Sequence, residues 1–112
     1  MLSKENRMDK ETIGLVVKSG RSFSSDSFNL KTAPIAGGRS LFAFVVSSKV
    51  SKKATERNKL KRRARNIIRK VLSEVKKGAG IIFFFKVSAK DRTYRELKEE
   101  MTNSLKKARI LQ

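Results

Sequence analysis

Apolar residues in the first part of the chain follow the three-to-four-residue spacing of a helix and then change to the alternation of a strand. Residues 9–19 predict a short helix, with Asp9 or Thr12 as its N-cap and Gly20 as its stop. The apolar side of this helix consists of Ile13, Val16 and Val17. Apolar and polar residues alternate over residues 27–32, which predicts a half-buried strand.

A turn and a second strand are predicted next. Residues 33–39 contain the only proline of the chain and a pair of glycines, which favour a turn. Residues 40–47 are rich in aromatic and β-branched side chains, so they predict a strand or two short ones.

The second half contains the strongest helical pattern. Residues 55–76 predict a long helix with Thr55 as its N-cap and Gly78 as its stop. Residues 80–87 are apolar at the positions facing both sides of a strand, which predicts a buried central strand. Residues 91–109 predict a second amphipathic helix. The order α-β-β-α-β-α predicts an α+β fold, a single α/β sandwich spanning residues 1–112.

The composition excludes several kinds of chemistry. The 112 residues include no cysteine and no histidine, so there is no thiolate nucleophile, no imidazole base and no Cys-ligated metal. The longest apolar run, residues 41–46, is much shorter than the roughly 20 residues of a membrane span. The first residues alternate in charge and lack the apolar core of a signal peptide. We therefore expect a soluble, cytoplasmic protein with no membrane partner.

The net charge of +18 indicates a polyanionic partner. Residues 49–77 hold thirteen basic residues against Glu56 and Glu74, so about a quarter of the chain carries more than half of the net charge. A solvated helix face usually mixes both signs, whereas this segment is strongly dominated by positive charge.

The predicted long helix separates its apolar and basic residues. At 100° per residue, its apolar positions fall within one arc of about 100°, the width of a core stripe. These positions are Leu60, Ala64, Ile67, Ile68, Val71 and Val75. Arginine and lysine side chains surround that arc, and guanidinium groups match phosphate oxygens with paired donors. Asn58 adds a group for sugar or base contacts, or a cap.

The basic segment resembles a known family. The run from Ser48 to Arg65 (SKVSKKATERNKLKRRAR) closely resembles the signature of the bacterial ribonuclease P protein subunit: paired lysines, a basic turn, and an Arg-Asn-Arg/Lys-x-Lys-Arg helix. The resemblance extends to Arg7-Met8 with the first helix, to Phe28-x-Leu30, and to the later strands and C-terminal helix.

The resemblance implies a fold and a function. The fold is similar to the second domain of a small-subunit ribosomal protein, with a left-handed β-α-β crossover against the usual rule. The implied partners are ribonuclease P RNA, bound one to one, and precursor tRNA, whose 5′ leader is removed. The RNA is the catalyst and mainly holds the Mg²⁺, so the protein itself contributes no catalytic residue and no metal ligand.

The resemblance also assigns residues to two sites. The positions implied to bind the catalytic RNA are Lys49, Lys52, Lys53, Arg57, Asn58, Lys59, Lys61, Arg62 and Arg65. The positions implied to line a leader-binding cleft between the first helix and the sheet are Ile13, Val17, Asn29, Lys31, Ser47 and Lys49.

The cleft positions depart from the family pattern. Members usually carry stacking aromatics where this chain has Ile13, Val17 and Lys31, and a first paired lysine where it has Ser48. Lys31 shares a strand face with Asn29. We therefore expect weaker and more electrostatic leader binding.

Several residues allow two interpretations. Phe42, Phe44, Phe83 and Phe85 are expected in the core rather than on a stacking surface. Phe23 is either a loop anchor or a substitute leader contact. Three acidic residues on the last helix suit ion pairs better than a metal site: Glu96, Glu99 and Glu100.

Two other functions compete with the ribonuclease P assignment. A structural RNA-binding or ribosomal protein would use the same charge and fold, although the basic motif argues against it. A stand-alone nuclease is improbable, because the chain lacks histidine and has no clustered carboxylates near its basic segment.

Overall fold

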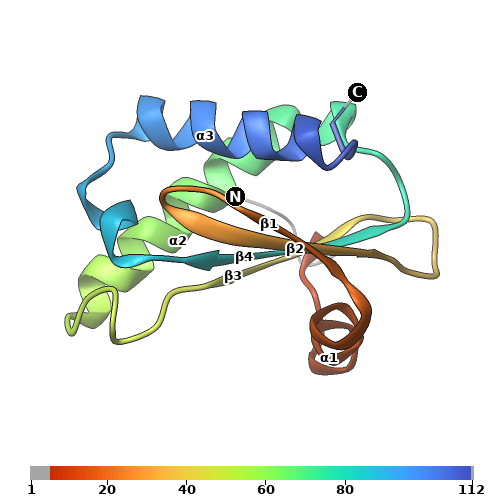
Figure 1. Cartoon of the computed structure of the whole chain (residues 1–112), viewed down its shortest axis with the longest axis horizontal. Helices are drawn as coiled ribbons and strands as arrows, with labels where there is room; N and C mark the ends of the chain where they lie inside the picture. Colours follow the sequence, from red (N-terminus) through yellow and green to blue (C-terminus); the bar gives the residue numbers. More distant parts are fainter. Residues whose placement is uncertain (1–5, 112) are drawn as a thin grey trace.

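A computed structural model describes residues 6–111 and contains one four-stranded sheet with helices on both faces (Figure 1). The strands lie in the order β1-β2-β4-β3. Their bounds are β1 Arg21–Ser24, β2 Phe28–Pro34, β3 Leu41–Val45 and β4 Ala79–Phe85. Strands β1, β2 and β4 pair antiparallel, whereas β3 pairs parallel to β4. The predicted mixed α+β fold is confirmed.

The helices form two unequal layers. Helices α2 (Ala54–Val71) and α3 (Tyr94–Lys107) cover one face of the sheet, and α1 (Lys10–Ser19) lies alone against the other (Figure 1). A parallel pair needs a crossover connection, and α2 supplies it between β3 and β4. The left-handed sense of this β-α-β crossover stays a prediction that rests on the resemblance. No helix within the described part of the chain is long and apolar enough to cross a membrane.

Strand β4 divides its side chains between two apolar clusters. Ile81, Phe83 and Phe85 pack with α2 and α3 in the main core. Ile82 is fully buried on the opposite face, in a smaller cluster under α1 that also contains Phe84. This division explains why β4 is apolar at the positions facing both sides of the sheet, as expected of a strand covered on both faces.

The predicted core phenylalanines pack as rings in contact. Phe28 and Phe83 meet edge to face at 5.2 Å, and Phe83 stacks on Phe44 at 5.8 Å. Phe42, Phe83 and Phe85 are buried, whereas Phe44 on the edge strand is only half-buried. The core interpretation is confirmed for these residues, because all of them belong to or pack against one cluster.

Helix α1 approaches the sheet closely through Val16, which is 0% exposed. A Cβ atom on Gly80 of β4 would lie 2.8 Å from Val16 Cγ2. At the helix end, a Cβ on Gly20 would lie 2.4 Å from the Val16 carbonyl oxygen. Glycine at position 80 therefore permits the close packing of α1 on β4, and glycine at position 20 avoids a clash with the last turn of α1 itself.

The structure corrects several predicted boundaries. Residues 55–76 do not form one helix, because α2 ends at Val71 and a 3₁₀ turn, η2 (Leu72–Glu74), follows. Gly78 is consequently not the helix stop but a turn residue before β4, with a φ of 79°. Strand β2 continues to Pro34, which enters the predicted turn.

Two further elements were not predicted. The short strand β1 has one half-buried side chain, Phe23, so it lacks a readable alternation. Residues 87–91 form a 3₁₀ turn, η3 (Val87–Asp91), and α3 begins only at Tyr94. Arg7 precedes α1 and forms a parallel bridge with Phe42, so it does not belong to the helix.

Candidate nucleic-acid interface

Helix α2 buries its apolar stripe and turns its basic side outward, as its sequence predicts. Its buried residues are Leu60, Ala64, Ile67, Ile68 and Val71. Because these side chains fix the rotation of the helix on the sheet, the orientation of the basic face is also fixed. Six of the predicted RNA contacts are exposed: Lys49, Lys52, Lys53, Asn58, Lys59 and Arg62. The other three, Arg57, Lys61 and Arg65, are half-buried.

The basic turn before α2 is held together by Arg57. Its Nη1 donates a hydrogen bond to the Ser51 carbonyl oxygen at 2.9 Å. The Ser51 hydroxyl in turn accepts from the Lys53 backbone N–H at 3.2 Å. Arg57 therefore orders the turn that carries Lys49, Lys52 and Lys53, in addition to contributing its own charge.

The N-terminus of α2 differs from the prediction. The helix begins at Ala54 with Lys53 as the N-cap residue, so the assignment of Thr55 as the cap is wrong. Within the described residues no side chain caps this end. Lysines beside the positive end of a helix dipole are unfavourable, and an anion bound there would be favourable. The turn and helix end thus combine to attract phosphate.

The remaining basic residues of α2 have different surroundings. Arg63 Nη1 donates to the Arg92 carbonyl oxygen at 3.4 Å, so Arg63 links α2 to the segment before α3. Arg65 lines a small cavity of about 150 Å³ together with Arg7 and Phe44. Arg65 therefore lies at the edge of the sheet, beside a half-buried aromatic ring.

The predicted cleft residues on α1 and β2 do lie together. Lys31 Nζ donates a hydrogen bond to the Val17 carbonyl oxygen at 2.8 Å. Ile13 is half-buried against the smaller apolar cluster, and Val17 is 41% exposed. Asn29 is exposed and lies toward the end of β2 away from Pro34. Ser47 and Lys49 are exposed and follow the C-terminal end of β3.

Phe84 is an aromatic residue on this face that the sequence interpretation missed. It pairs with Asn29 of β2 and with Val45 of β3, and its ring packs half-buried against the α1 cluster. Phe84 points away from Phe83 and Phe85, so strand alternation was the signal that could have identified it. The family's usual aromatic positions are aliphatic or basic here, but the same face retains one ring.

Phe23 lies on the other side of the sheet. It pairs with Leu30 and packs against the main core, under the Arg21 guanidinium at 5.4 Å. The interpretation of Phe23 as a loop anchor is wrong, because this residue belongs to β1. A leader contact at Phe23 stays a prediction, although the side chain packs on the face of the sheet opposite α1.

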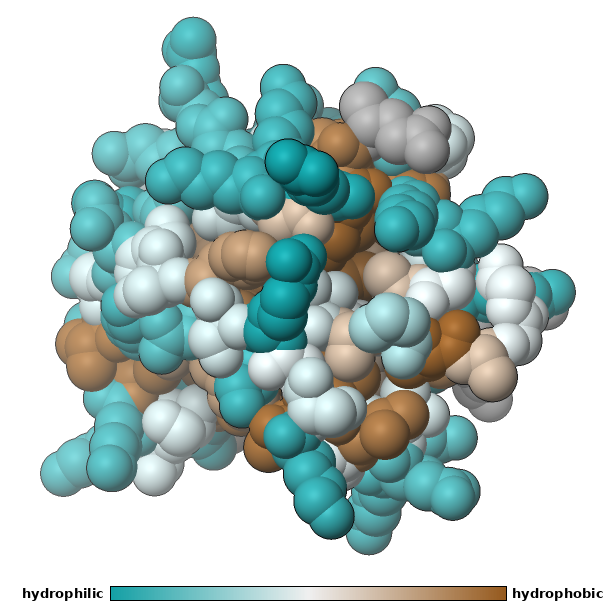
Figure 2. All heavy atoms as spheres, turned by 45° about the vertical axis from the view of Figure 1, so that its right-hand side comes forward, coloured by the Kyte–Doolittle hydropathy of each residue, from teal (hydrophilic) through white to brown (hydrophobic). Residues whose placement is uncertain are grey.

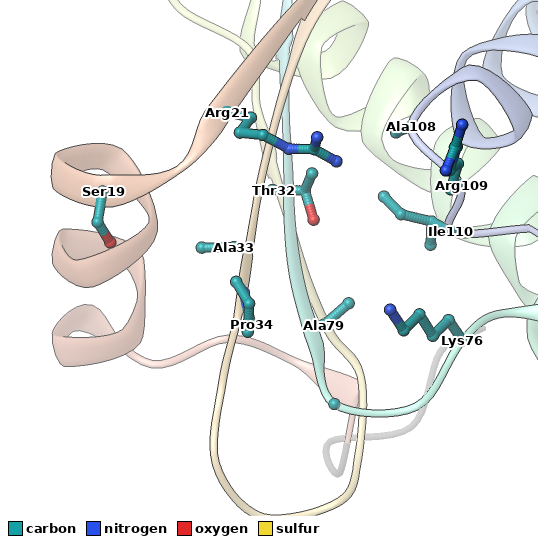
Figure 3. Close-up of a pocket in the computed structure, with 11 residues that line it drawn as sticks. Ser19, Arg21, Thr32, Ala33, Pro34, Lys76, Ala79, Ala108, Arg109 and Ile110 are labelled. Carbon is teal, nitrogen blue, oxygen red and sulfur yellow. The ribbon is translucent and has the colours of Figure 1, made fainter.

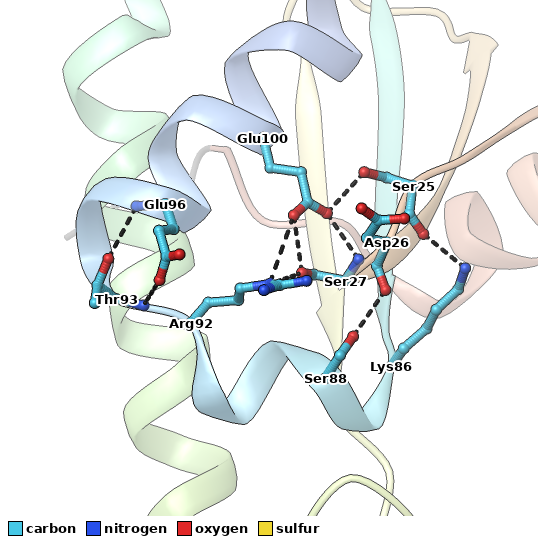
Figure 4. Close-up of polar contacts among 9 residues, drawn as sticks. All are labelled: Ser25, Asp26, Ser27, Lys86, Ser88, Arg92, Thr93, Glu96 and Glu100. Atoms are coloured by element: carbon cyan, nitrogen blue, oxygen red, sulfur yellow. Dashed lines mark hydrogen bonds and ion pairs between the residues drawn. The ribbon is translucent and has the colours of Figure 1, made fainter.

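Two of the three acidic residues of α3, Glu96 and Glu100, form structural contacts (Figure 4). Glu96 and Thr93 make a capping box, in which the Thr93 N–H donates to Glu96 Oε1 at 2.9 Å. This hydrogen bond lowers the pKa of Glu96 below its usual value. Glu100 accepts hydrogen bonds from the Ser25 hydroxyl and from the N–H and hydroxyl of Ser27, at 2.7–2.8 Å.

Ion pairing is the better interpretation for Glu100, whose Oε1 lies 4.0 Å from Arg92 Nε. Arg92 Nε also donates to the Ser27 hydroxyl at 2.9 Å. The Glu100 carboxylate therefore links α3 to the turn between β1 and β2 through hydrogen bonds (Figure 4). Among the described residues, no three His, Cys, Asp or Glu side chains gather in a group that could hold a metal ion.

These features define the chain as a small α+β protein that presents a basic helix and basic turn suited to a polyanion. The model of the family described as Ribonuclease P matches residues 2–109, and the chain belongs to this family.

Known proteins agree with that membership. The ribonuclease P protein component of Pseudanabaena sp. is 43% identical over 67 residues, which are 60% of this chain and 58% of that protein. The match thus spans less than two thirds of that relative's length. A Staphylococcus aureus RNase P protein mutant with defective mRNA degradation activity has a TM-score of 0.89 at 25% identity, covering 96% of this chain and 92% of that one. The Thermotoga maritima RNase P protein has a TM-score of 0.82 at 27% identity, covering 90% and 96%.

Proposed function

We propose that this protein is the subunit of ribonuclease P that binds the catalytic RNA through the basic face of α2 and the turn before it. The observation that carries the proposal is the fixed rotation of α2, which buries Leu60, Ala64 and Ile68 and directs Arg62 and Lys59 to solvent. The uncapped N-terminus of α2, surrounded by lysines, adds a site where one phosphate would be stabilised.

The 5′ leader of precursor tRNA would bind across the sheet face that carries α1. This face presents Val17 and Asn29 with the ring of Phe84, and Ser47 and Lys49 follow β3 at the same end of the sheet. A single-stranded leader needs an apolar surface for its bases and cations for its backbone. The face supplies a single ring, so leader binding would depend largely on charge.

The reaction would be hydrolysis of one phosphodiester bond, leaving a 5′-phosphate on mature tRNA. When bound, Mg²⁺ supplies an activated water and stabilises the leaving oxygen. The described carboxylates do not form a ligand set for it, because Glu96 and Glu100 are engaged in structural hydrogen bonds. We propose that the partner RNA holds the metal, while the protein, in one copy per RNA in the cytoplasm, neutralises phosphates and binds the leader.

A cleavage assay tests this proposal. The purified protein is mixed with a bacterial ribonuclease P RNA and 5′-labelled precursor tRNA at low magnesium, with RNA-alone and protein-alone controls. We expect accurate 5′ cleavage only when both are present. Tight RNA binding without stimulation, also with RNA from the same organism, would instead indicate a structural RNA-binding protein.

A matched pair of variants tests the assigned surface. Arg62→Gln removes an exposed guanidinium from the basic face, whereas Arg95→Gln removes one from exposed α3. We expect only Arg62→Gln to weaken RNA affinity. It should also reduce the slope of log affinity against log salt concentration by about one. Equal effects would show that net charge, rather than the α2 surface, determines binding.

A further inference from the structure

A second basic region lies at the end of the sheet opposite the basic turn. The turn follows the C-terminal end of β3, and β4 runs parallel to β3, so the start of β4 at Ala79 lies at the other end. The seven residues of β4 correspond to about 23 Å at 3.3 Å per residue. A site beside Ala79 is therefore well separated from Lys52 and Lys53.

At that end, a pocket of about 350 Å³ opens between β2, the start of β4 and the end of α3 (Figure 3). Its volume is at the lower end of ligand-sized clefts, roughly 300–1,000 Å³. Arg21 and Lys76 extend into this space from opposite sides, and Arg109 lies at the end of α3 (Figure 3). The Thr32 hydroxyl oxygen also points into it (Figure 3).

The charge of this pocket has one sign. Its lining includes three cations from three separate segments and no aspartate or glutamate. A pocket beside α2 is different, since Glu56 and Asp91 line it together with lysines and arginines. None of the three cationic groups forms an ion pair within the described residues. Figure 2, which brings this side of the molecule forward, shows hydrophilic side chains projecting around apolar surface.

The backbone conformation of Arg109 is a second observation, independent of the charge of the pocket. Arg109 follows the C-cap Ala108 with a φ of 60°, the left-handed conformation that favours glycine. The N–H of Ile110 donates to the Leu105 carbonyl at 2.9 Å, and that of Arg109 donates to Lys106, which closes α3 in a Schellman motif. Glycine would fit this backbone with less strain. The chain instead has an arginine here, and Arg109 is one of the residues that line the pocket.

Arg21 is also held in place. Its guanidinium lies over the Phe23 ring at 5.4 Å, a cation–π contact that orients the group. Three cations near one another repel in the free protein, and a bound anion would remove that repulsion. Planar guanidinium groups and a hydroxyl match the oxygens of a phosphate group.

We propose that Arg21, Lys76, Arg109 and Thr32 form a phosphate-binding pocket that holds a backbone phosphate of RNA. This pocket is a second RNA contact, separated from α2 by the length of the sheet. The inference rests on the proposed function only for RNA as the source of the phosphate, because the pocket chemistry also suits inorganic phosphate.

The first arm of the test uses inorganic phosphate. The isotope-labelled full-length chain is titrated while its backbone amide resonances are followed by NMR. We expect the amides of Thr32, Ala79 and Arg109 to shift in a saturable manner. Shifts confined to the turn at residues 49–53 would overturn the pocket.

The second arm uses a ribonuclease P RNA and three variants. Arg109→Gly removes the guanidinium and relaxes the backbone, so its melting temperature should be unchanged or higher. Its RNA affinity should nevertheless fall about fivefold to tenfold. The slope of log affinity against log salt concentration should decrease by about one. Lys107→Gln is the matched control, because Lys107 is exposed on the same helix end and does not line the pocket. It should change affinity by less than about twofold.

The third variant, Arg62→Gln, separates the two proposals. If Arg62→Gln weakens RNA binding while Arg109→Gly behaves like Lys107→Gln, the pocket does not contact RNA and the proposed function stands. If phosphate shifts the pocket amides in that case, the site binds free phosphate and the RNA contact is refuted. If all three variants behave alike, both proposals fail.

Discussion

Lys31 Nζ lies 2.8 Å from the carbonyl oxygen of Val17, so strand β2 holds the last turn of α1 through one charged hydrogen bond. The lysine charge is placed at the negative end of the helix dipole, where a cation is stabilising. A residue that the resemblance implied only as part of a leader-binding cleft therefore also supports the C-terminal end of α1.

Lys31→Gln should destabilise α1 by about 0.5 kcal/mol, because it removes the charge from the helix C-terminus. Amide hydrogen exchange should become faster in α1 but not in α3. Lys98→Gln removes an exposed lysine from α3 and is the charge-matched control. Unchanged exchange in α1 would show that the Lys31–Val17 hydrogen bond does not stabilise the helix.

Phe84→Leu should reduce the preference for leader-bearing over leaderless tRNA. Stacking of a base on an aromatic ring contributes about 1–3 kcal/mol, so partial stacking on this half-buried ring should correspond to roughly a threefold to tenfold loss. The measurement is the ratio of holoenzyme affinities for the two substrates. Phe23→Leu, on the opposite face of the sheet, is the control. An equal ratio in both variants would contradict a leader contact at Phe84.

Ile13→Phe should have the opposite effect. It restores an aromatic ring at a half-buried position of α1 that faces the same cluster as Phe84. We expect tighter binding of leader-bearing tRNA and no change for leaderless tRNA, measured with the same pair of substrates. Equal binding of the two substrates before and after the substitution would exclude this face as the leader site.

Two glycine substitutions should act in opposite directions. Gly80→Ala would place a Cβ 2.8 Å from Val16 Cγ2, so α1 must move and stability should fall by about 1–3 kcal/mol. Gly14→Ala meets no atom within 4 Å on the exposed side of α1 and should raise stability by about 0.5–1 kcal/mol. Urea denaturation measures both values. Equal effects would argue against close packing of α1 on β4.

Acid should weaken two helix N-termini. Hydrogen bonds from Thr12 lower the pKa of Asp9, and the Thr93 N–H lowers that of Glu96. A carboxylate whose pKa is lower in the folded state stabilises the protein above its unfolded pKa. That stability is lost as the pH falls through the folded pKa. Asp9→Asn and Glu96→Gln should each reduce the pH dependence of the urea midpoint between about pH 5 and pH 3.

The long helix and the basic face were predictable because their signals are local and repeated. The apolar stripe from Leu60 to Val71 has helical spacing, and so do the surrounding arginines. The start of α3 was missed, because the prediction began the helix at residue 91. The spacing of Thr93 and Glu96 is that of a capping box and was the signal that could have identified the start at Tyr94.

Other features depend on contacts between distant segments. Strand β1 exists because it pairs with β2, and its sequence has no alternation strong enough to show it. Lys53 is the N-cap residue although Thr55 has the better capping side chain, because the hydrogen bond from Arg57 to Ser51 fixes the preceding turn. The basic pocket joins Arg21, Lys76 and Arg109, whose proximity follows only from the folded chain.

The strand order β1-β2-β4-β3 also determines when the chain can fold during synthesis. Strand β3 pairs in the sheet only with β4, and β4 is the last strand to leave the ribosome. Helix α2, which carries eight of the 28 basic residues, therefore emerges before the sheet that buries its apolar stripe is complete. The nascent chain therefore exposes the apolar stripe of α2 beside its cationic side chains until β4 has been added, because the sheet cannot form completely before Phe85.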